Sequence, residues 1–396
     1  MGSRHRVESV SANTGRWALR LEDVSAPSPG PEWRTPLTLT VSQRSRVGMV
    51  GANGSGKSTL LAIIAGYRAP ATGRVEVAPG VSLGHLPQKV SLEAGFTVRQ
   101  SIEDGASRVR SMLSRYQELA GQVAGDSSQD VLDELSALVE SLDVAHGWDF
   151  DAQVTQAMTA LGCPDPGAVV DQLSAGERRR VALCRLLISG PSLLLLDEPS
   201  NDLDLGGLDW LEHYLQAYSG TVIFATHDRQ LLSTCADWIV ELDRTGLHRY
   251  RGGYRAYVDA KIEDFVVLGR KDADQLRALE YEHIRSRSRQ PSSGRALSQP
   301  EQGSDPFTEG LGLVPVPAAA RLGHDVISCE SLTIRAADRL LVEGLSFTVP
   351  PGAVVGVVGP NGVGKTTLLR TLAGCHAPSG GALRGGPTVS LGFTDA

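Results

Sequence analysis

The 396-residue sequence has few cysteines, few aromatic residues (5%) and no long hydrophobic run. Its five cysteines are odd in number, far apart and without metal-ligand spacing, so they predict reduced thiols in a cytoplasmic protein. The strongest apolar run, residues 193–196, is closed by two acidic residues and falls far short of the roughly 18 residues that span a bilayer. These shortages argue against a disulfide-built secreted domain and against insertion of the chain itself into a membrane.

An excess of positive charge is also lacking. The formal net charge is −7, which disfavours general electrostatic affinity for nucleic acid, so any RNA contact must be local. The first six residues hold no apolar segment, and Arg6 breaks the myristoylation pattern, so we expect neither a secretion signal nor a lipid anchor. With 41% hydrophobic and 21% charged residues, the composition predicts an ordinary globular protein of two or three domains.

What the sequence does contain is a phosphate-binding loop of the pattern G-x-x-x-x-G-K-[ST], the Walker A motif, in two copies. Each copy follows a strand-like apolar run, at residues 46–50 and 354–358, and opens an apolar helix. In such a loop backbone N–H groups point at phosphate oxygens, and the helix dipole favours their negative charge. The residues predicted to bind ATP are Gly51, Asn53, Gly54, Ser55, Gly56, Lys57, Ser58 and Thr59, and Gly359, Asn361, Gly362, Val363, Gly364, Lys365, Thr366 and Thr367.

Within these loops, single residues have predicted roles. Lys57 is expected to reach the β- and γ-phosphates, and Ser58, like Thr366 in the second copy, to ligate Mg²⁺. The match continues beyond the loops, because Ser-Thr-Leu-Leu-Ala-Ile-Ile-Ala-Gly recurs as Thr-Thr-Leu-Leu-Arg-Thr-Leu-Ala-Gly. The sequence therefore predicts the beginning of a domain-length repeat.

An acidic strand end supplies the expected catalytic carboxylates. The run 193–196 leads into Asp197 and Glu198, which predicts that Asp197 holds Mg²⁺ through water and that Glu198 deprotonates the attacking water. His227 follows a second strand-like run, residues 221–225, from which it can reach the γ-phosphate region. The alternative interpretations are acidic residues at a helix N-terminus and a structural histidine.

A helix start of the form Leu-Ser-x-Gly-Glu, residues 173–177, lies between these motifs and is called the signature below. Ser174 and Glu177 within it form a capping box. Capping alone would account for both residues. Taken together and in this order, however, the motifs resemble the ABC ATPase family. The resemblance implies an α/β P-loop NTPase fold. It adds Gln88 to the catalytic and metal-binding residues, and Ser174 and Gly176 to the ATP contacts.

The resemblance narrows to the ABC-F subfamily, tandem ATPases without membrane domains that act on ribosomes. The narrowing features are two cores in one chain, Glu177 in the signature, the run Asp-Glu-Pro-Ser-Asn-Asp-Leu-Asp that ends at Asp204, the Gly253-Tyr254 turn and a helical linker. This implies ATP and Mg²⁺ as ligands and the ribosome with its RNA as partner, in a translation factor or an antibiotic-resistance protein. The alternative is the ATPase subunit of a transporter with separate membrane proteins.

Two groups of basic residues give local support for an RNA contact, with a solvated charged face as the alternative. These are His283, Arg285, Arg287 and Arg289 in the linker, and Arg178, Arg179 and Arg180 after the signature. Some positions depart from the family pattern. Ala175 replaces a usual glycine, Asp202 a usual histidine, and Ala336 an expected adenine-stacking aromatic residue. In the first core Trp33 is a candidate for that stacking, or else a surface-loop tryptophan.

The motifs divide the chain into four segments. Residues 17–257 are predicted to form the first ATP-binding domain, with residues 89–172 as an inserted helical subdomain. Residues 258–325 read as a linker, helical and then flexible because Pro, Ser and Gly dominate. Residues 326–396 are predicted to be the first part of a second ATP-binding domain.

In ABC ATPases each ATP lies between the phosphate loop of one core and the signature of another. Here the first loop has Lys57 and Glu198, but its opposing signature would lie beyond Ala396, and the second loop has Lys365 without an acidic pair. We therefore expect a fragment of a longer tandem ATPase with a marginal second core. A naturally truncated product would need homodimers of the first core to complete each site.

Overall fold

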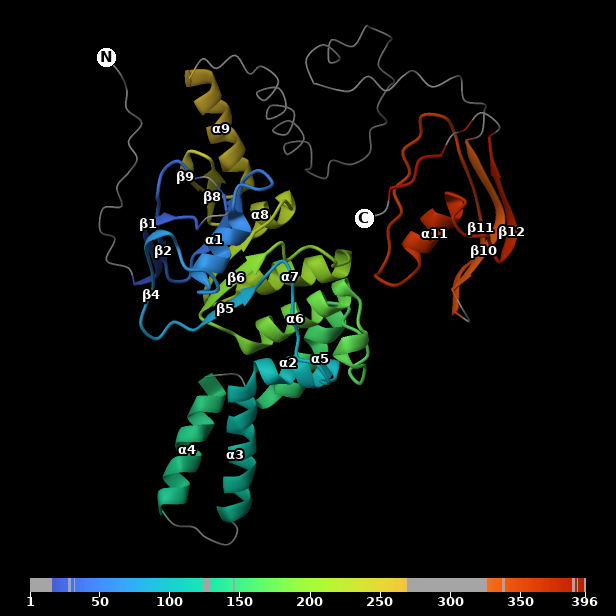
Figure 1. The fold of residues 1–396 in the computed structure, drawn as a ribbon. Helices are drawn as coiled ribbons and strands as arrows, with labels where there is room; N and C mark the ends of the chain where they lie inside the picture. Colours follow the sequence, from blue (N-terminus) through green and yellow to red (C-terminus); the bar gives the residue numbers. More distant parts are fainter. Residues whose placement is uncertain are drawn as a thin grey trace, which may run out of the picture. The chain divides into compact units, whose positions relative to one another are not determined.

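The computed structural model places two compact units, Met1–Gln290 and Pro291–Ala396, each of which is described by itself (Figure 1). The helical linker expected over residues 258–325 is described only as far as residue 268. The basic group His283, Arg285, Arg287 and Arg289 lies outside the described part. The described residues are 16–27, 30–31, 33–123, 129–144, 147–268, 326–336, 339–386, 389 and 391–394.

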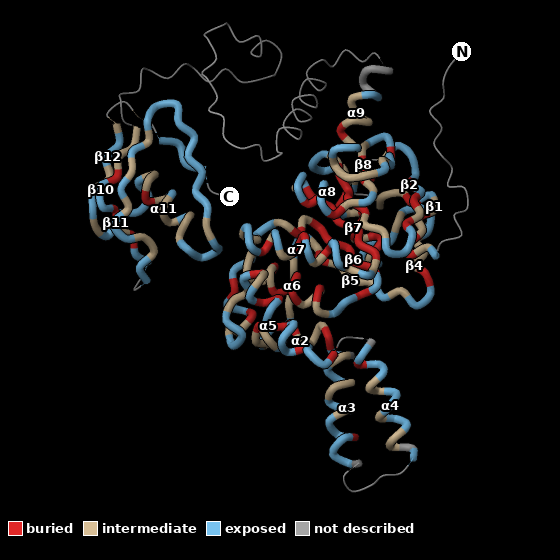
Figure 2. The backbone as a smooth tube through the Cα atoms, turned by 180° about the vertical axis from the view of Figure 1, so that it is seen from behind, coloured by how far each residue is buried: buried red, intermediate tan, exposed pale blue. Residues whose placement is uncertain are grey.

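A six-stranded sheet forms the centre of the first unit. Its strand order is β5-β6-β7-β3-β8-β9, with all neighbours parallel except the antiparallel pair β8 and β9. Both faces of a parallel sheet are covered, which explains why β6 and β7 are buried at every position (Figure 2). The strands are β3 (Arg46–Val50), β5 (Leu83–Leu86), β6 (Leu193–Asp197), β7 (Thr221–Ala225), β8 (Trp238–Asp243) and β9 (Gly246–Arg251).

A smaller antiparallel sheet of order β2-β1-β4 packs over helix α1 (Lys57–Ile64). Its strands are β1 (Trp17–Ser25), β2 (Leu37–Ser42) and β4 (Thr72–Val77). Leu60 and Leu61 of α1 are fully buried in one apolar cluster with residues from both sheets. Because α1 is enclosed between two sheets, it is apolar nearly all round, as a buried helix should be.

Helices inserted between β5 and β6 form the second part of this unit. They are α2 (Val98–Gly105), α3 (Ser107–Val123), α4 (Gln129–Val144), α5 (Phe150–Ala160) and α6 (Ala175–Ser189). Helices α3 and α4 make an antiparallel hairpin that extends away from the sheet, with Leu119 and Leu142 buried along its length (Figure 1). Helices α2 and α5 pack against α6, which connects the insertion to the sheet.

Three further helices follow the strands of the main sheet. Helix α7 (Leu205–Ala217) follows β6, α8 (Arg229–Cys235) follows β7, and α9 (Tyr254–Leu268) follows the β8–β9 hairpin. Alternation of buried strands and helices is the pattern of an α/β core. The predicted α/β fold class is therefore confirmed.

Among its described residues, the second unit contains an antiparallel sheet of order β11-β10-β12 and one helix that packs on it. Its elements are β10 (Ile327–Ala336), β11 (Arg339–Val349), β12 (Gly380–Gly385) and α11 (Lys365–Leu372). Only Cys329, Leu332 and Ile334 are buried in the centre of its apolar cluster. The prediction of a strand at residues 354–358 is wrong.

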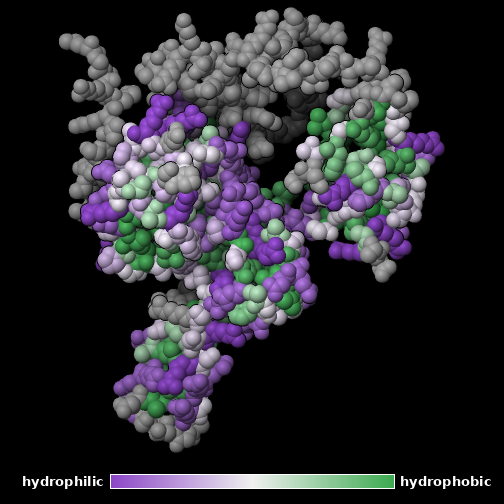
Figure 3. Space-filling view, viewed as in Figure 1, coloured by the Kyte–Doolittle hydropathy of each residue, from purple (hydrophilic) through white to green (hydrophobic). Residues whose placement is uncertain are grey.

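That run is unpaired and exposed. Val354 is 99% exposed and Val358 79% exposed. In the first unit the equivalent strand, β3, lies between β7 and β8, whereas no described strand lies beside residues 354–358. A strand is defined by its pairing, so an apolar sequence without neighbours does not become one. Figure 3 shows hydrophobic residues gathered on the visible face of this unit.

Candidate nucleotide site

The first phosphate loop is a set of backbone turns that glycine makes possible. Gly51, Gly54 and Gly56 have φ values of +154°, +78° and +102°, and Gly56 caps α1 in the left-handed region. A Cβ on Gly51 would lie 2.3 Å from the Leu242 carbonyl oxygen. The loop is thus shaped as a cradle with no room for a side chain at Gly51 or Gly56, whereas Gly54 faces open space.

Gly56 gives a direct test of this cradle. A Cβ there would lie 2.6 Å from Pro31 Cγ and 2.9 Å from Trp33 Cζ2. We expect Gly56→Ala to add about 1–3 kcal/mol of strain and to weaken binding of a fluorescent ATP analogue roughly tenfold. Gly54→Ala is the control, because its φ is also positive but no atom lies within 4 Å of the added Cβ. Equal losses in the two variants would contradict this interpretation.

Lys57 lies at the first position of α1 and is buried, with only 8% of its surface exposed. Its ammonium group donates to the carbonyl oxygens of Gly51 (2.6 Å) and Ala52 (3.3 Å). Burial lowers the pKa of Lys57 below its usual value, while the charges of Glu198 and Asp197 oppose that shift. The structure thus brings the predicted lysine and both predicted carboxylates within electrostatic reach of one another.

Asp197 and Glu198 stand where β6 ends. Asp197 is 3% exposed, and the Glu198 backbone N–H donates to the Ala225 carbonyl oxygen at 2.7 Å, which fixes this turn against β7. Glu198 has φ of +49°, an uncommon conformation for a non-glycine residue and one that clusters at functional sites. Its side chain is 14% exposed.

His227 contacts the same carboxylate from the end of β7. The His227 backbone N–H donates to Glu198 Oε2 at 3.3 Å, and its Nε2 lies 3.5 Å from Glu198 Oε1. The imidazole is 57% exposed, so it covers Glu198 from the open side. Glu198 and His227, which are far apart in the sequence, form one contact pair.

Arg179 is the site residue that the sequence reasoning missed. Its guanidinium group donates to the carbonyl oxygens of Gln88 (2.6 Å), Pro87 (3.2 Å), Glu198 (2.9 Å) and, in a short bond, Asp197. Burial lowers its pKa, with Asp202 as the strongest opposing charge. Arg179 therefore joins the segment that carries Gln88 to the acidic strand end.

The prediction that the arginines after the signature contact RNA is wrong for the buried Arg179, and it stays a prediction for Arg178 and Arg180. Arg179 is only 7% exposed, and Arg180 donates to the carbonyl oxygens of Gly162 (2.9 Å) and Asp202 (3.2 Å). A signal was present in the sequence. Arg179, Leu183 and Leu187 are spaced by four residues and share the buried face of α6.

The signature serine does cap a helix. Ser174 accepts from the Glu177 N–H at 3.3 Å, and Glu177 accepts from the Ser174 N–H at 2.9 Å and from its hydroxyl at 2.7 Å. These bonds lower the pKa of Glu177. Ser174 is exposed, and within the described residues neither it nor Gly176 forms a hydrogen bond with the phosphate loop. Their predicted contact with ATP therefore stays a prediction.

The residues present fit a phosphate group and a magnesium ion. Ser55 Oγ is buried without a hydrogen-bond partner among the described residues, at the inner side of the loop near Gly51. The described part of the chain contains no cluster of three His, Cys, Asp or Glu side chains that could hold a metal by itself. Ser58, Asp197 and Gln88 offer oxygen donors, which suits Mg²⁺ bound through few side chains and substrate phosphates.

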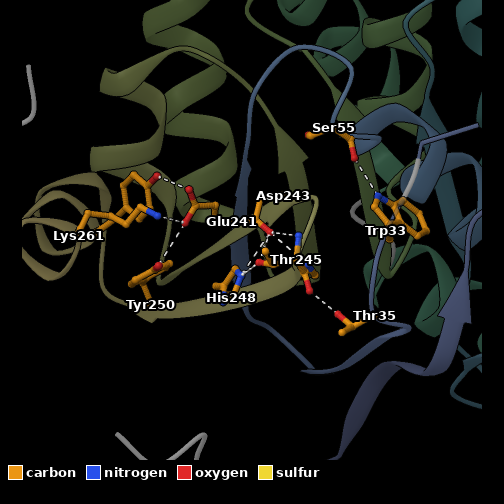
Figure 4. A network of polar contacts seen from close by, with 11 residues as sticks. Trp33, Thr35, Ser55, Glu241, Asp243, Thr245, His248, Tyr250 and Lys261 are labelled. Atoms are coloured by element: carbon orange, nitrogen blue, oxygen red, sulfur yellow. Dashed lines mark hydrogen bonds and ion pairs between the residues drawn. The ribbon is translucent and has the colours of Figure 1, made fainter. Parts of the chain in front are cut away.

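Trp33 lies against the phosphate loop and does not stand free on the surface. Its indole N–H donates to the Ser55 carbonyl oxygen at 2.9 Å (Figure 4). The loop that carries it is tied to the tip of the β8–β9 hairpin, where the Arg34 N–H donates to the Arg244 carbonyl oxygen at 2.8 Å and the Thr35 hydroxyl to that of Thr245. Whether Trp33 stacks on adenine stays a prediction.

The base of α9 is fixed to the same hairpin. Glu241 of β8 accepts from Lys261 (2.8 Å) and from the hydroxyls of Tyr257 (3.1 Å) and Tyr250 (3.2 Å). Glu241 also lies beside Val50, the residue before the phosphate loop, in the β3–β8 pair. The start of the linker helix is therefore anchored next to the nucleotide loop.

The second phosphate loop repeats the first in its backbone. Gly359, Gly362 and Gly364 have φ values of +155°, +74° and +104°, and Lys365 donates to the carbonyl oxygens of Gly359 (2.6 Å) and Pro360 (2.8 Å). Thr366 and Thr367 follow in the first turn of α11. Ala336, the position without the expected aromatic ring, is exposed at the end of β10.

Comparison with known proteins decides the family. The family model described as "ABC transporter" matches residues 35–201 and 342–390, more than half of the chain. The chain belongs to this family. An "Energy-dependent translational throttle protein EttA" of Mycobacterium tuberculosis (strain H37Rv) is 41% identical over 367 residues, which are 91% of this chain and 66% of that protein.

Two further relatives agree with this assignment. The protein of the same name from Haemophilus influenzae is 38% identical over 368 residues, with the same shares of both chains. The "ATP-binding protein ChvD" of Rhizobium radiobacter is 43% identical over 290 residues, which are 72% of this chain and all of that protein. The chain thus spans 66% of the length of the throttle proteins, and the resemblance to the ABC-F subfamily is confirmed.

Among the helices that the structure describes, none has both the length and the apolar character required to cross a membrane.

Proposed function

We propose that the first unit binds Mg²⁺-ATP in the loop of residues 51–58 and hydrolyses it. The observation that carries the proposal is the Glu198 carboxylate, held by His227 beside the buried ammonium of Lys57. A carboxylate in such a place can accept a proton from water, and the lysine can bind phosphate oxygens. Magnesium, when bound, supplies positive charge that stabilises the charge developing on the phosphates.

The remaining predicted residues take defined parts in this proposal. Backbone N–H groups of the loop bind the phosphates, Ser58, Asp197 and Gln88 hold the metal directly or through water, and His227 orients Glu198. Arg179 keeps Gln88 and Glu198 at a fixed separation through their carbonyl oxygens. Ser174 and Gly176 are proposed to contact ATP bound to another core, either the second loop with Lys365 or a homodimer partner.

We further propose that this activity drives a translation factor in the cytoplasm that binds the ribosome. Support comes from the throttle proteins, whose name assigns them an energy-dependent role in translation. The anchoring of α9 beside the phosphate loop gives a physical route by which nucleotide binding could move the linker. A resistance factor is the second form of this proposal, with the same ribosomal partner.

Sedimentation with ribosomes tests the proposal. Glu198→Gln removes the proton acceptor but keeps size and hydrogen bonding, so a ribosome factor should be held in its ATP-bound state. We expect this variant to pellet with ribosomes in ATP and to stay in the supernatant in ADP, whereas the unchanged chain should be released after hydrolysis. Equal pelleting of both in every nucleotide, or of neither, would contradict a ribosome factor and favour a transporter subunit.

A further inference from the structure

Strand β9, at the edge of the six-stranded sheet, carries two arginines whose guanidinium groups lie over the indole ring of Trp238. Arg249 and Arg251 lie opposite Val240 and Trp238 in the β8–β9 pair, so both point to the face that carries the Trp238 side chain. Their guanidinium carbons lie 4.6 and 5.8 Å from the centroid of the Trp238 ring. Both arginines are exposed, and Trp238 is half-buried.

The positive charge of this pair is not compensated. None of the described residues forms an ion pair with Arg249 or Arg251. Burial against its surroundings lowers the pKa of Arg249, and no carboxylate opposes that shift. Other surface arginines of this acidic chain do have partners, such as Arg74 with Glu22 and Arg115 with Glu134. Two like charges held side by side are stabilised when an anion binds between them.

The spacing and shape of the pair fit a nucleic-acid strand. Residues two apart on a strand are about 7 Å apart, comparable to successive phosphates of an extended strand. Guanidinium groups donate paired hydrogen bonds to phosphate oxygens, and their flat faces stack on bases, as the indole does. Strand β9 forms the edge of the sheet, and no described strand pairs with its outer side, although β2 and α9 contact it.

We propose that Arg249, Arg251 and Trp238 form a binding surface for single-stranded RNA. The proposal deepens the proposed function, on which its setting at the ribosome rests. The contact is local, which agrees with a chain whose net charge of −7 gives no general affinity for nucleic acid. An acidic peptide would satisfy the two charges but offers no bases to stack on them.

Fluorescence anisotropy with a labelled RNA of roughly 12 nucleotides tests the surface on the full chain, without nucleotide and over a series of salt concentrations. The double variant Arg249→Gln/Arg251→Gln should bind roughly tenfold or more weakly at low salt. Its plot of log K against log salt should be flatter by about 1.4, because each lost contact to a single strand removes about 0.7. The control Arg74→Gln/Arg115→Gln loses the same charge from paired arginines and should bind as the unchanged chain does.

A lysine variant separates the contribution of the positive charge to RNA binding from that of the flat guanidinium group. Arg249→Lys/Arg251→Lys should keep the salt dependence but lose several-fold in affinity, because lysine has no flat face. An unchanged affinity and slope in the glutamine variant would overturn the proposal, as would a poly-glutamate peptide that displaces the RNA as well as unlabelled RNA does. The assay contains no ribosomes, so failure of the Glu198→Gln sedimentation test leaves it intact, and each proposal can fail without the other.

Discussion

Replacement of Arg179 by methionine should destabilise the first unit by about 3–5 kcal/mol and abolish ATP hydrolysis. Methionine fills a similar volume but cannot donate to the carbonyl oxygens of Pro87, Gln88, Asp197 and Glu198. The Asp197 carbonyl is buried, so loss of its donor adds a cost of about 1–3 kcal/mol, and the three partly buried carbonyls add less because water can replace their bonds. The thermal midpoint should fall by roughly 10 °C, given about 2–4 °C per kcal/mol in domains of this size.

The adjacent Arg178 supplies a matched control. It lies one position earlier on α6, is half-exposed, and forms no hydrogen bond or ion pair through its side chain with the described residues. Arg178→Met should change stability by less than about 0.5 kcal/mol. Equal midpoints for the two variants in circular-dichroism melts would show that the Arg179 bonds do not hold the site together.

The local motifs were predictable because their chemistry is written in consecutive residues. A phosphate loop needs glycine at Gly51, Gly54 and Gly56, and the structure gives each a positive φ. The capping box of Ser174 and Glu177 also depends on residues only three apart, and both bonds are present. The buried strand β6 followed from its run of leucines.

Contacts between distant segments were not predictable in the same way. Arg179 appeared in a basic cluster, and its spacing with Leu183 and Leu187 marked a buried face without saying which carbonyls it meets. The ties from Thr35 to the β8–β9 hairpin span 210 residues, and no local pattern encodes them. These bonds depend on the fold as a whole.

At residues 354–358 the sequence predicted a strand that the structure does not contain. The composition of this run matches β3 in the first unit, yet it stays unpaired and exposed. The difference lies in the neighbours, since β3 pairs with β7 and β8, whereas no described strand lies beside the second run. Strand propensity expresses fit to a sheet more than a preference of the backbone itself.

In the proposed function, Glu198 activates water for ATP hydrolysis in the first unit. Glu198→Gln keeps the side chain's shape and can still contact His227, so ATP affinity should stay within about threefold, or roughly 0.7 kcal/mol. Loss of the proton acceptor should slow hydrolysis by about 10²–10⁴-fold. Glu118→Gln, on the exposed face of α3, changes the same charge at a remote position and should leave the rate unaltered.

The most direct measurement is single-turnover phosphate release from radiolabelled ATP with the full chain in excess over nucleotide, and binding measured in parallel. Glu198→Gln should bind ATP normally and release phosphate at least about a hundredfold more slowly than the unchanged chain. Release at the same rate in both chains would contradict the role assigned to Glu198 and, with it, the proposed site.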